Sequence, residues 1–89
     1  MKPEVFKMRV GRAYRQATGA RNYLGAQAWF IQKCGTPTGR KYGLGKAGQR
    51  TVSRWYCGVN PVSVGARLLL ADLEAEAVET KRARVAATN

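Results

Sequence analysis

Apolar residues recur at helical spacing in four segments of the chain, and this pattern predicts an all-α fold of four to five helices. The clearest stripe runs through residues 61–79, where apolar positions follow one another at intervals of four, three, one, three and four. We expect one long amphipathic helix there. Leu68 lies at the edge of the stripe, and an exposed leucine at that position would suit dimerisation. The stripe itself consists of Val62, Ala66, Leu69, Leu70, Leu73 and Ala77.

Two earlier segments, 3–17 and 21–34, show the same period less cleanly and predict the first two helices. Pro3 and Glu4 suit a first turn, because proline loses no hydrogen bond there and an acid meets the positive end of the helix dipole. Gly35 ends the second segment. The cations of the first segment admit two interpretations, a solvated face or contacts with phosphate. They are Lys7, Arg9, Arg12 and Arg15.

Residues 35–48 interrupt the helical pattern and predict an inserted, flexible, basic loop. Five of the ten glycines of the chain lie in this segment, together with Arg40, Lys41 and Lys46. The spacing lacks the G-x-x-x-x-G-K-[ST] order of a phosphate-binding loop. The segment is therefore either a disordered linker or an arm that lies on phosphates or enters a minor groove, and a short hairpin around residues 43–45 is a further alternative.

The stretch from residue 49 to residue 66 carries the most specific pattern of the chain. Val52 and Trp55 are three positions apart, so they share one face of a short helix over residues 49–57. Gly58 occupies the position of a helix C-cap glycine. A turn follows at Asn60-Pro61, and proline suits the first position of the next helix.

Residues 50–58, Arg-Thr-Val-Ser-Arg-Trp-Tyr-Cys-Gly, and then Asn60-Pro61-Val62 resemble the recognition-helix half of a known DNA-binding family. This family is the phage-repressor type of helix-turn-helix, also called Cro/C1-like or XRE-like. The resemblance is good over 49–74, weaker over 12–35, and fails over 36–48, because the motif needs a turn of about four residues. It implies a helix-turn-helix transcription regulator, most simply a repressor, that binds double-stranded DNA as a homodimer on an inverted repeat.

The resemblance also implies a role for individual residues. The start of the recognition helix would enter the major groove, where arginine pairs with guanine and glutamine with adenine. The candidate base-reading residues are Gln49, Arg50, Thr51 and Arg54. Charge and position, rather than the resemblance, indicate the candidate phosphate contacts, which are Arg12, Arg15, Arg21, Arg40, Lys41, Lys46 and Ser53. The expected core includes Val52, Trp55, Leu69 and Leu73, and a generic small helix with a buried tryptophan is the alternative for 49–57.

The placement of charge agrees with a nucleic-acid partner. The 89 residues carry a net charge of +11, and residues 1–60 hold twelve of the sixteen Lys and Arg but only one acid, Glu4. Such a field attracts polyanions. Residues 61–89 are balanced, with four cations and four acids. We expect one domain over residues 1–79 and a frayed basic tail over residues 80–89.

Composition argues against several other classes of protein. The chain has no histidine, two cysteines without metal-ligand spacing, and no paired carboxylates in its basic part, so we expect no enzyme, cofactor, metal site or small-molecule ligand. No leader or membrane-spanning run is visible, and a reducing cytoplasmic setting fits best. Two rival functions stay open. They are a non-specific nucleic-acid binder, and a small phage-like inhibitor that docks on an acidic host protein.

Overall fold

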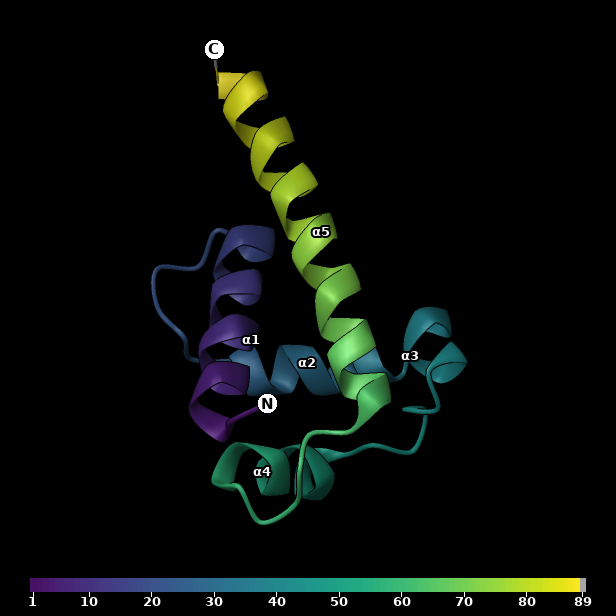
Figure 1. Cartoon of the computed structure of the whole chain (residues 1–89). Helices are drawn as coiled ribbons and strands as arrows, with labels where there is room; N and C mark the ends of the chain where they lie inside the picture. Colours follow the sequence, from purple (N-terminus) through teal and green to yellow (C-terminus); the bar gives the residue numbers. More distant parts are fainter. Residues whose placement is uncertain (89) are drawn as a thin grey trace.

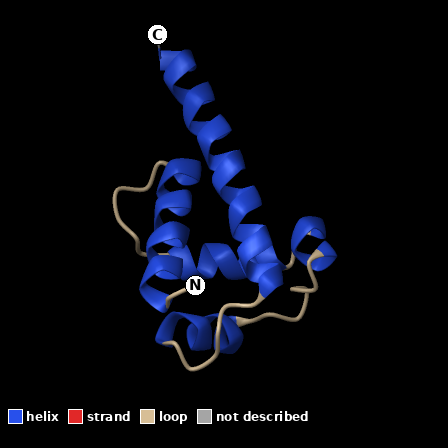
Figure 2. Ribbon diagram, viewed as in Figure 1, coloured by secondary structure: helices blue, strands red, loops and turns tan. Residues whose placement is uncertain are grey.

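Five helices make up residues 1–88, the part of the chain that this computed structural model describes (Figures 1 and 2). They are α1 (Pro3–Thr18), α2 (Ala26–Cys34), α3 (Pro37–Lys41), α4 (Gln49–Cys57) and α5 (Val64–Thr88). No strand occurs between residues 1 and 88, so the predicted all-α class is confirmed. α1 and α5 pack side by side, and α4 lies at the end of the molecule where both of them begin (Figure 1).

Left-handed glycines end the two helices that matter most for the candidate site. α1 stops at Gly19, whose φ is 76°, and the Gly19 N–H donates to the Arg15 carbonyl oxygen. α4 stops at Gly58, whose φ is 75°. Glycine adopts this conformation without the strain that a β-carbon brings. The C-cap role expected for Gly58 is confirmed.

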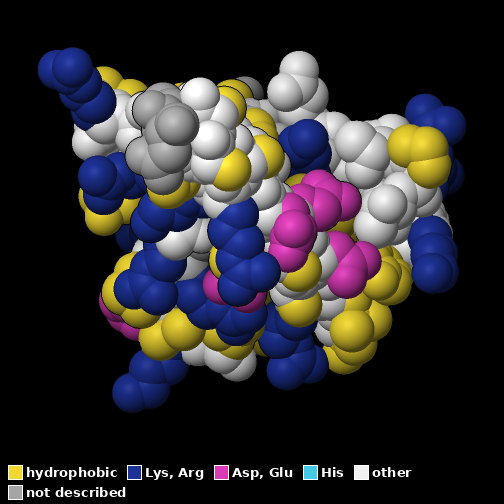
Figure 3. All heavy atoms as spheres, turned by 90° about the horizontal axis from the view of Figure 1, so that it is seen from above, with side chains coloured by type: hydrophobic (Ala, Val, Ile, Leu, Met, Phe, Trp, Pro, Cys, Tyr) yellow, Lys and Arg dark blue, Asp and Glu magenta, His cyan; other side chains and the backbone are white. Residues whose placement is uncertain are grey.

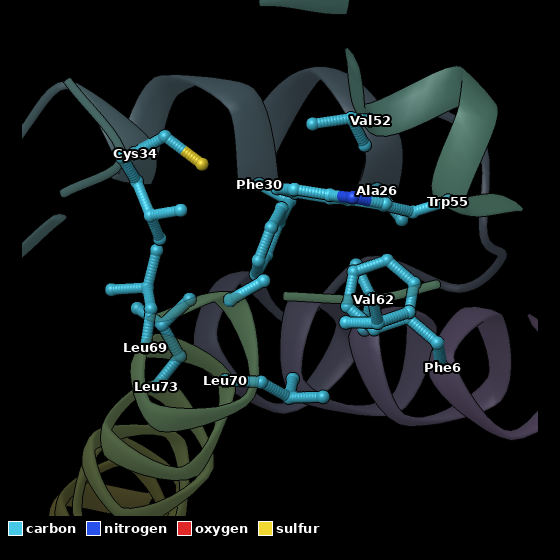
Figure 4. Close-up of a cluster of buried hydrophobic side chains, with 13 residues drawn as sticks. Phe6, Ala26, Phe30, Cys34, Val52, Trp55, Val62, Leu69, Leu70 and Leu73 are labelled. Carbon is cyan, nitrogen blue, oxygen red and sulfur yellow. The ribbon is translucent and has the colours of Figure 1, made fainter. Parts of the chain in front are cut away.

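The centre of the core is an aromatic cluster around Phe6 of α1 (Figure 4). The Phe6 ring meets the rings of Phe30, Trp55 and Tyr56 edge to face, with centroid distances of 5.4, 6.1 and 5.6 Å respectively. These distances lie in the range that favours aromatic pairs. Because Phe30 belongs to α2 and the other two partners belong to α4, this one side chain joins three helices.

α5 closes the core with the apolar stripe expected from its sequence. Leu69, Leu70, Leu73 and Ala77 are at most 4% exposed, and α1 is the main neighbour of α5. An ion pair at the edge adds to this contact, where Nε of Arg9 in α1 donates to Glu74 of α5 at 3.0 Å. The four side chains expected in the core, Val52, Trp55, Leu69 and Leu73, all lie there.

The second helix begins later than its periodicity predicted. α2 starts at Ala26, and residues 19–25 form an irregular connection instead of the first turn of a helix. Two local features account for this. The side chain of Asn22 accepts a hydrogen bond from the Leu24 N–H at 3.0 Å, which favours a turn. Gly25 then takes a left-handed conformation, with φ of 89°, that a right-handed helix excludes.

The inserted, flexible loop expected over residues 35–48 is interrupted by a short helix, and residues 42–48 form turns without regular structure. Residues Pro37–Lys41 form α3, whose N-cap residue Thr36 accepts a hydrogen bond from the Gly39 N–H. Leu44 is only 5% exposed and belongs to the core. A β-carbon at Gly39 would collide with the Cys34 carbonyl group, so this glycine permits close packing rather than freedom of movement. Glycine content alone does not distinguish glycines that allow close packing from glycines that make a loop flexible.

A hydrogen bond also ties this segment to α5. The Tyr42 hydroxyl donates to a carboxylate oxygen of Asp72 at 2.6 Å. The bond to this carboxylate, with smaller contributions from burial and from the Asp72 charge, raises the pKa of Tyr42. The contribution of the bond to stability is therefore present at neutral pH and is lost as the pH rises through the pKa of the phenol.

α5 also differs from expectation at both ends. It begins at Val64 rather than 61, because Ser63 caps it by accepting a hydrogen bond from the Ala66 N–H at 3.1 Å. It continues to Thr88 through most of the segment expected to be a frayed tail, while Asn89 lies outside the described residues. Residues 80–88 are rich in alanine, lysine and arginine, which have high helix propensity. The helix propensity of these residues explains why α5 continues, whereas their positive charge had suggested a frayed tail.

Replacement of Leu44 tests whether the 35–48 segment is part of the core. We expect Leu44→Ala to lower the free energy of unfolding by about 2–4 kcal/mol, because it leaves a cavity beside α5. The melting temperature should then fall by at least about 8 °C for a domain of this size. The control is Lys46→Ala, which removes an exposed side chain two residues away. Equal melting temperatures for the two variants would mean that the segment is a loop after all.

Candidate nucleic-acid interface

α4 presents one apolar face to the core and one polar face to solvent. Val52 and Trp55 are buried at 0% and 5% exposure. Arg50, Arg54 and Cys57 follow one another at intervals of four and three, and all three are exposed. This spacing places them on one strip along the helix. Gln49, also exposed, stands next to that strip in the first turn of the helix.

Contacts on several sides hold α4 in a fixed orientation. The Trp55 and Tyr56 rings pack on Phe6 of α1. From α2, the Gln27 side chain donates a hydrogen bond to Oγ of Ser53 at 2.7 Å. Burial raises the pKa of Tyr56 to about 12, so its ring stays neutral in this contact at any ordinary pH. These contacts with α1 and α2 fix the rotation of α4 about its own axis, and so the direction of its exposed strip.

Two of the predicted contact residues on α4 have a different environment from the one expected. Ser53 was expected at a phosphate, but it is half-buried and its hydroxyl oxygen is bound to Gln27. It therefore belongs to the α2–α4 contact. Thr51 was expected to reach a base edge, and it is half-buried rather than exposed. Sequence spacing could not foresee the contact of Ser53, because its partner Gln27 on α2 lies 26 residues away.

The charge on the exposed strip is not neutralised within the protein. α4 contains two arginines and no acid. The ion pairs found among residues 1–88 are Arg9–Glu74 and Arg82–Glu79, and neither involves α4. Lys46 is exposed three residues before the helix begins. The strip can thus offer guanidinium donors to an external acceptor without first breaking an internal bond.

Lys7, for which the sequence left a solvated face and a phosphate contact open, lies close to α4. Lys7 of α1 lines a groove of about 540 Å³ together with Gln27 and Tyr56, so it flanks the recognition-helix candidate. Its neighbour Phe6 is the residue that packs on α4. A cation next to a core aromatic was therefore visible in the sequence, and the tertiary contact of Phe6 with α4 shows which helix that cation lies beside.

The other predicted phosphate contacts lie away from the strip. Arg40 and Lys41 are on α3, which stands apart from α4 beside the start of α5 (Figure 1). The Arg21 side chain is exposed on the connection that follows α1. Arg12 and Arg15 lie in the second half of α1, where they line a different groove with residues of α5. The predicted phosphate contacts therefore do not lie on one common surface.

Comparisons with protein-family models, with curated proteins and with solved structures find no match for this chain. The resemblance to the phage-repressor family therefore stays a prediction. Among the described residues, no group of three or more Cys, Asp or Glu side chains could hold a metal ion. Crossing a membrane would take a longer apolar stretch than any helix within residues 1–88 provides.

The two cysteines give a direct test of how α4 is exposed. Cys57 lies on the exposed strip, whereas Cys34 is fully buried and burial raises its pKa to about 11. The thiolate is the reactive form. At pH 8 we expect a thiol reagent to modify Cys57 at least about 100-fold faster than Cys34, and both at similar rates in denaturant. Rapid modification of Cys34 in the folded protein would contradict the burial of the end of α2 in the core.

Proposed function

We propose that the protein is a sequence-specific DNA-binding regulator of transcription, acting as a repressor, that reads the major groove with the exposed strip of α4. The observation that carries this proposal is a short helix locked on an aromatic core, with Gln49, Arg50 and Arg54 directed outward and no acid among them. Direct readout needs side chains of these types on a support that fixes their direction. The net charge of +11 supplies the general attraction to DNA.

The spacing along α4 suits two neighbouring base contacts. Arg50 and Arg54 are four residues apart, which is about 6 Å along a helix. Successive base pairs rise by about 3.4 Å, so the two guanidinium groups can address positions about two base pairs apart. Gln49, one position earlier, offers a donor and an acceptor that match adenine. Lys7 and Lys46 flank this set and would contact phosphates.

The proposed homodimer has a candidate surface on α5. This helix carries a second apolar stripe, distinct from the one in the core, at intervals of four, three, four and three residues. That period of 3.5 is the one by which two helices pack along a shared seam. Val64, Leu68 and Val78 are 61%, 47% and 41% exposed, and the alanines between them are exposed too. The stripe consists of Val64, Leu68, Ala71, Ala75 and Val78.

Charge also favours α5 as the contact between two copies. Two chains of charge +11 repel each other in general. Between Val64 and Thr88 the charges cancel, since four acids match four cations. The acids are Asp72, Glu74, Glu76 and Glu79, and the cations are Arg67, Lys81, Arg82 and Arg84. α5 is thus the long element along which a second copy can approach without that repulsion.

Selection of bound sequences from a random DNA pool tests the proposed function. We expect a consensus with inverted symmetry, and Arg50→Gln or Arg54→Gln should then weaken binding to the selected site by about 5- to 150-fold, the equivalent of 1–3 kcal/mol. Binding to a scrambled duplex at the same salt concentration should change much less. The matched control is Arg40→Gln, an equal loss of charge on α3. A pool without consensus would indicate a coating protein, and no retained DNA would indicate a protein partner.

Sedimentation of a variant at the α5 stripe tests the homodimer. Leu68→Glu places a charge in the middle of the proposed seam without touching the core, so we expect the folded protein to sediment as a monomer. Ala83→Glu adds the same charge to an exposed position of α5 outside the stripe and should leave the dimer intact. A parent protein that is monomeric at micromolar concentration, or a dimer that survives Leu68→Glu, would exclude this surface.

A further inference from the structure

A second basic surface lies in a groove between the end of α1 and the last turns of α5. The groove has a volume of about 400 Å³, and four cations line it, two from each helix. Figure 3, which views the molecule from this end, shows Lys and Arg side chains on several sides of the surface, with the largest group of Asp and Glu right of the centre. No carboxylate of the described chain lines the groove. Its lining cations are Arg12, Arg15, Lys81 and Arg84.

The walls of this groove are held by specific contacts rather than by chance proximity. The Tyr23 ring packs over Gly11 of α1, where any β-carbon would collide with it. The Tyr23 hydroxyl accepts a hydrogen bond from Arg15 at 3.2 Å, and the guanidinium carbon lies 5.1 Å from the ring centroid. On the other wall, Arg84 donates to the Gln16 carbonyl oxygen at the negative end of the α1 dipole.

These contacts leave two of the four cations directed at the groove without an acidic partner. Arg15 and Arg84 are engaged as described, whereas the ion pairs among residues 1–88 include neither Arg12 nor Lys81. Four like charges on adjoining turns repel one another, and this costs the fold stability. A bound polyanion would relieve the repulsion. The groove therefore has the chemistry of a phosphate-binding surface.

Its position separates this groove from the strip on α4. Phe6 touches α4, and Arg15 is nine residues further along α1, or about 14 Å. On α5, Arg84 is eighteen residues beyond Ala66, or about 27 Å. Both distances exceed the screening length of about 8–10 Å at physiological salt, whereas Arg12, six residues beyond Phe6, lies about 9 Å along α1. A duplex seated on α4, at the other end of the molecule, would leave the groove unoccupied (Figure 1).

We propose that this groove binds the phosphate backbone of a second nucleic-acid segment, so that one chain holds two segments at once. Arg12 and Arg15 are one turn apart on α1, and Lys81 and Arg84 are one turn apart on α5. The cations therefore form two short rows on neighbouring helices, which suits an extended chain of phosphates better than one compact anion. Phosphate contact of this kind positions a strand without reading its sequence.

A bridging assay tests the proposal. One duplex is immobilised, and capture of a second, fluorescent duplex by the protein is measured. If the parent protein dimerises, the assay uses the Leu68→Glu variant, because a dimer could bridge two duplexes through its two α4 helices. We expect Arg12→Gln/Lys81→Gln to abolish capture of the second duplex while binding to the first persists. The matched control, Arg67→Gln/Arg82→Gln, removes equal charge from α5 positions outside the groove and should still bridge.

A salt titration separates failure at the groove from failure at α4. In an Arg50→Gln/Arg54→Gln background, residual binding should depend on the groove, and adding Arg12→Gln/Lys81→Gln should reduce the slope of log affinity against log salt by about two, since each phosphate contact contributes about 0.9. An unchanged slope would overturn the second site whatever α4 does, and so would a monomeric protein that binds one duplex through α4 but never captures a second. Bridging blocked by millimolar ATP but not by an equal ionic strength of NaCl would assign the groove to free nucleotides and also overturn it.

Discussion

The packing of Phe6 against α2 and α4 is the contact on which the rest of the structure depends. Edge-to-face contacts from one fully buried ring orient Phe30, Trp55 and Tyr56 at the same time. A domain of 89 residues buries a modest core, so few other contacts could replace this one. Because Trp55 and Val52 face the cluster, the opposite side of α4 must face solvent. The direction of Arg50 and Arg54 is thus a consequence of core packing.

α5 has three different surfaces along one helix, and this division explains its length. Its buried stripe completes the core, its exposed stripe at 3.5-residue spacing is the proposed dimer contact, and its last turns form one wall of the basic groove. The acids between these surfaces have internal uses as well. Asp72 accepts a hydrogen bond from Tyr42, and Glu74 pairs with Arg9. The stretch of α5 that contains these acids therefore separates the basic groove from the strip on α4.

The sequence pattern predicted the features that depend on neighbouring residues, such as helix ends, but not those that depend on contacts between helices. The extent of α4 and its Gly58 cap followed from spacing and from the need for a left-handed residue. The segment 35–48 did not, because Leu44 and Gly39 act through contacts with other helices, which no glycine count contains. The candidate site divided in the same way. Arg50 and Arg54 share a strip because they share a helix, whereas Arg12 and Arg15 were separated from them by the direction of α1.

Amide chemical-shift mapping of the labelled protein with duplex DNA tests the central claim most directly, namely that α4 presents a fixed reading face to DNA. On addition of the selected duplex, we expect the largest changes at Gln49, Arg50, Arg54 and Cys57, and small changes at the core residues Phe6 and Phe30, because α4 is already in its binding orientation. A scrambled duplex should give weaker changes at the same positions. Shifts confined to α1 and α5, with α4 unaffected, would contradict the claim.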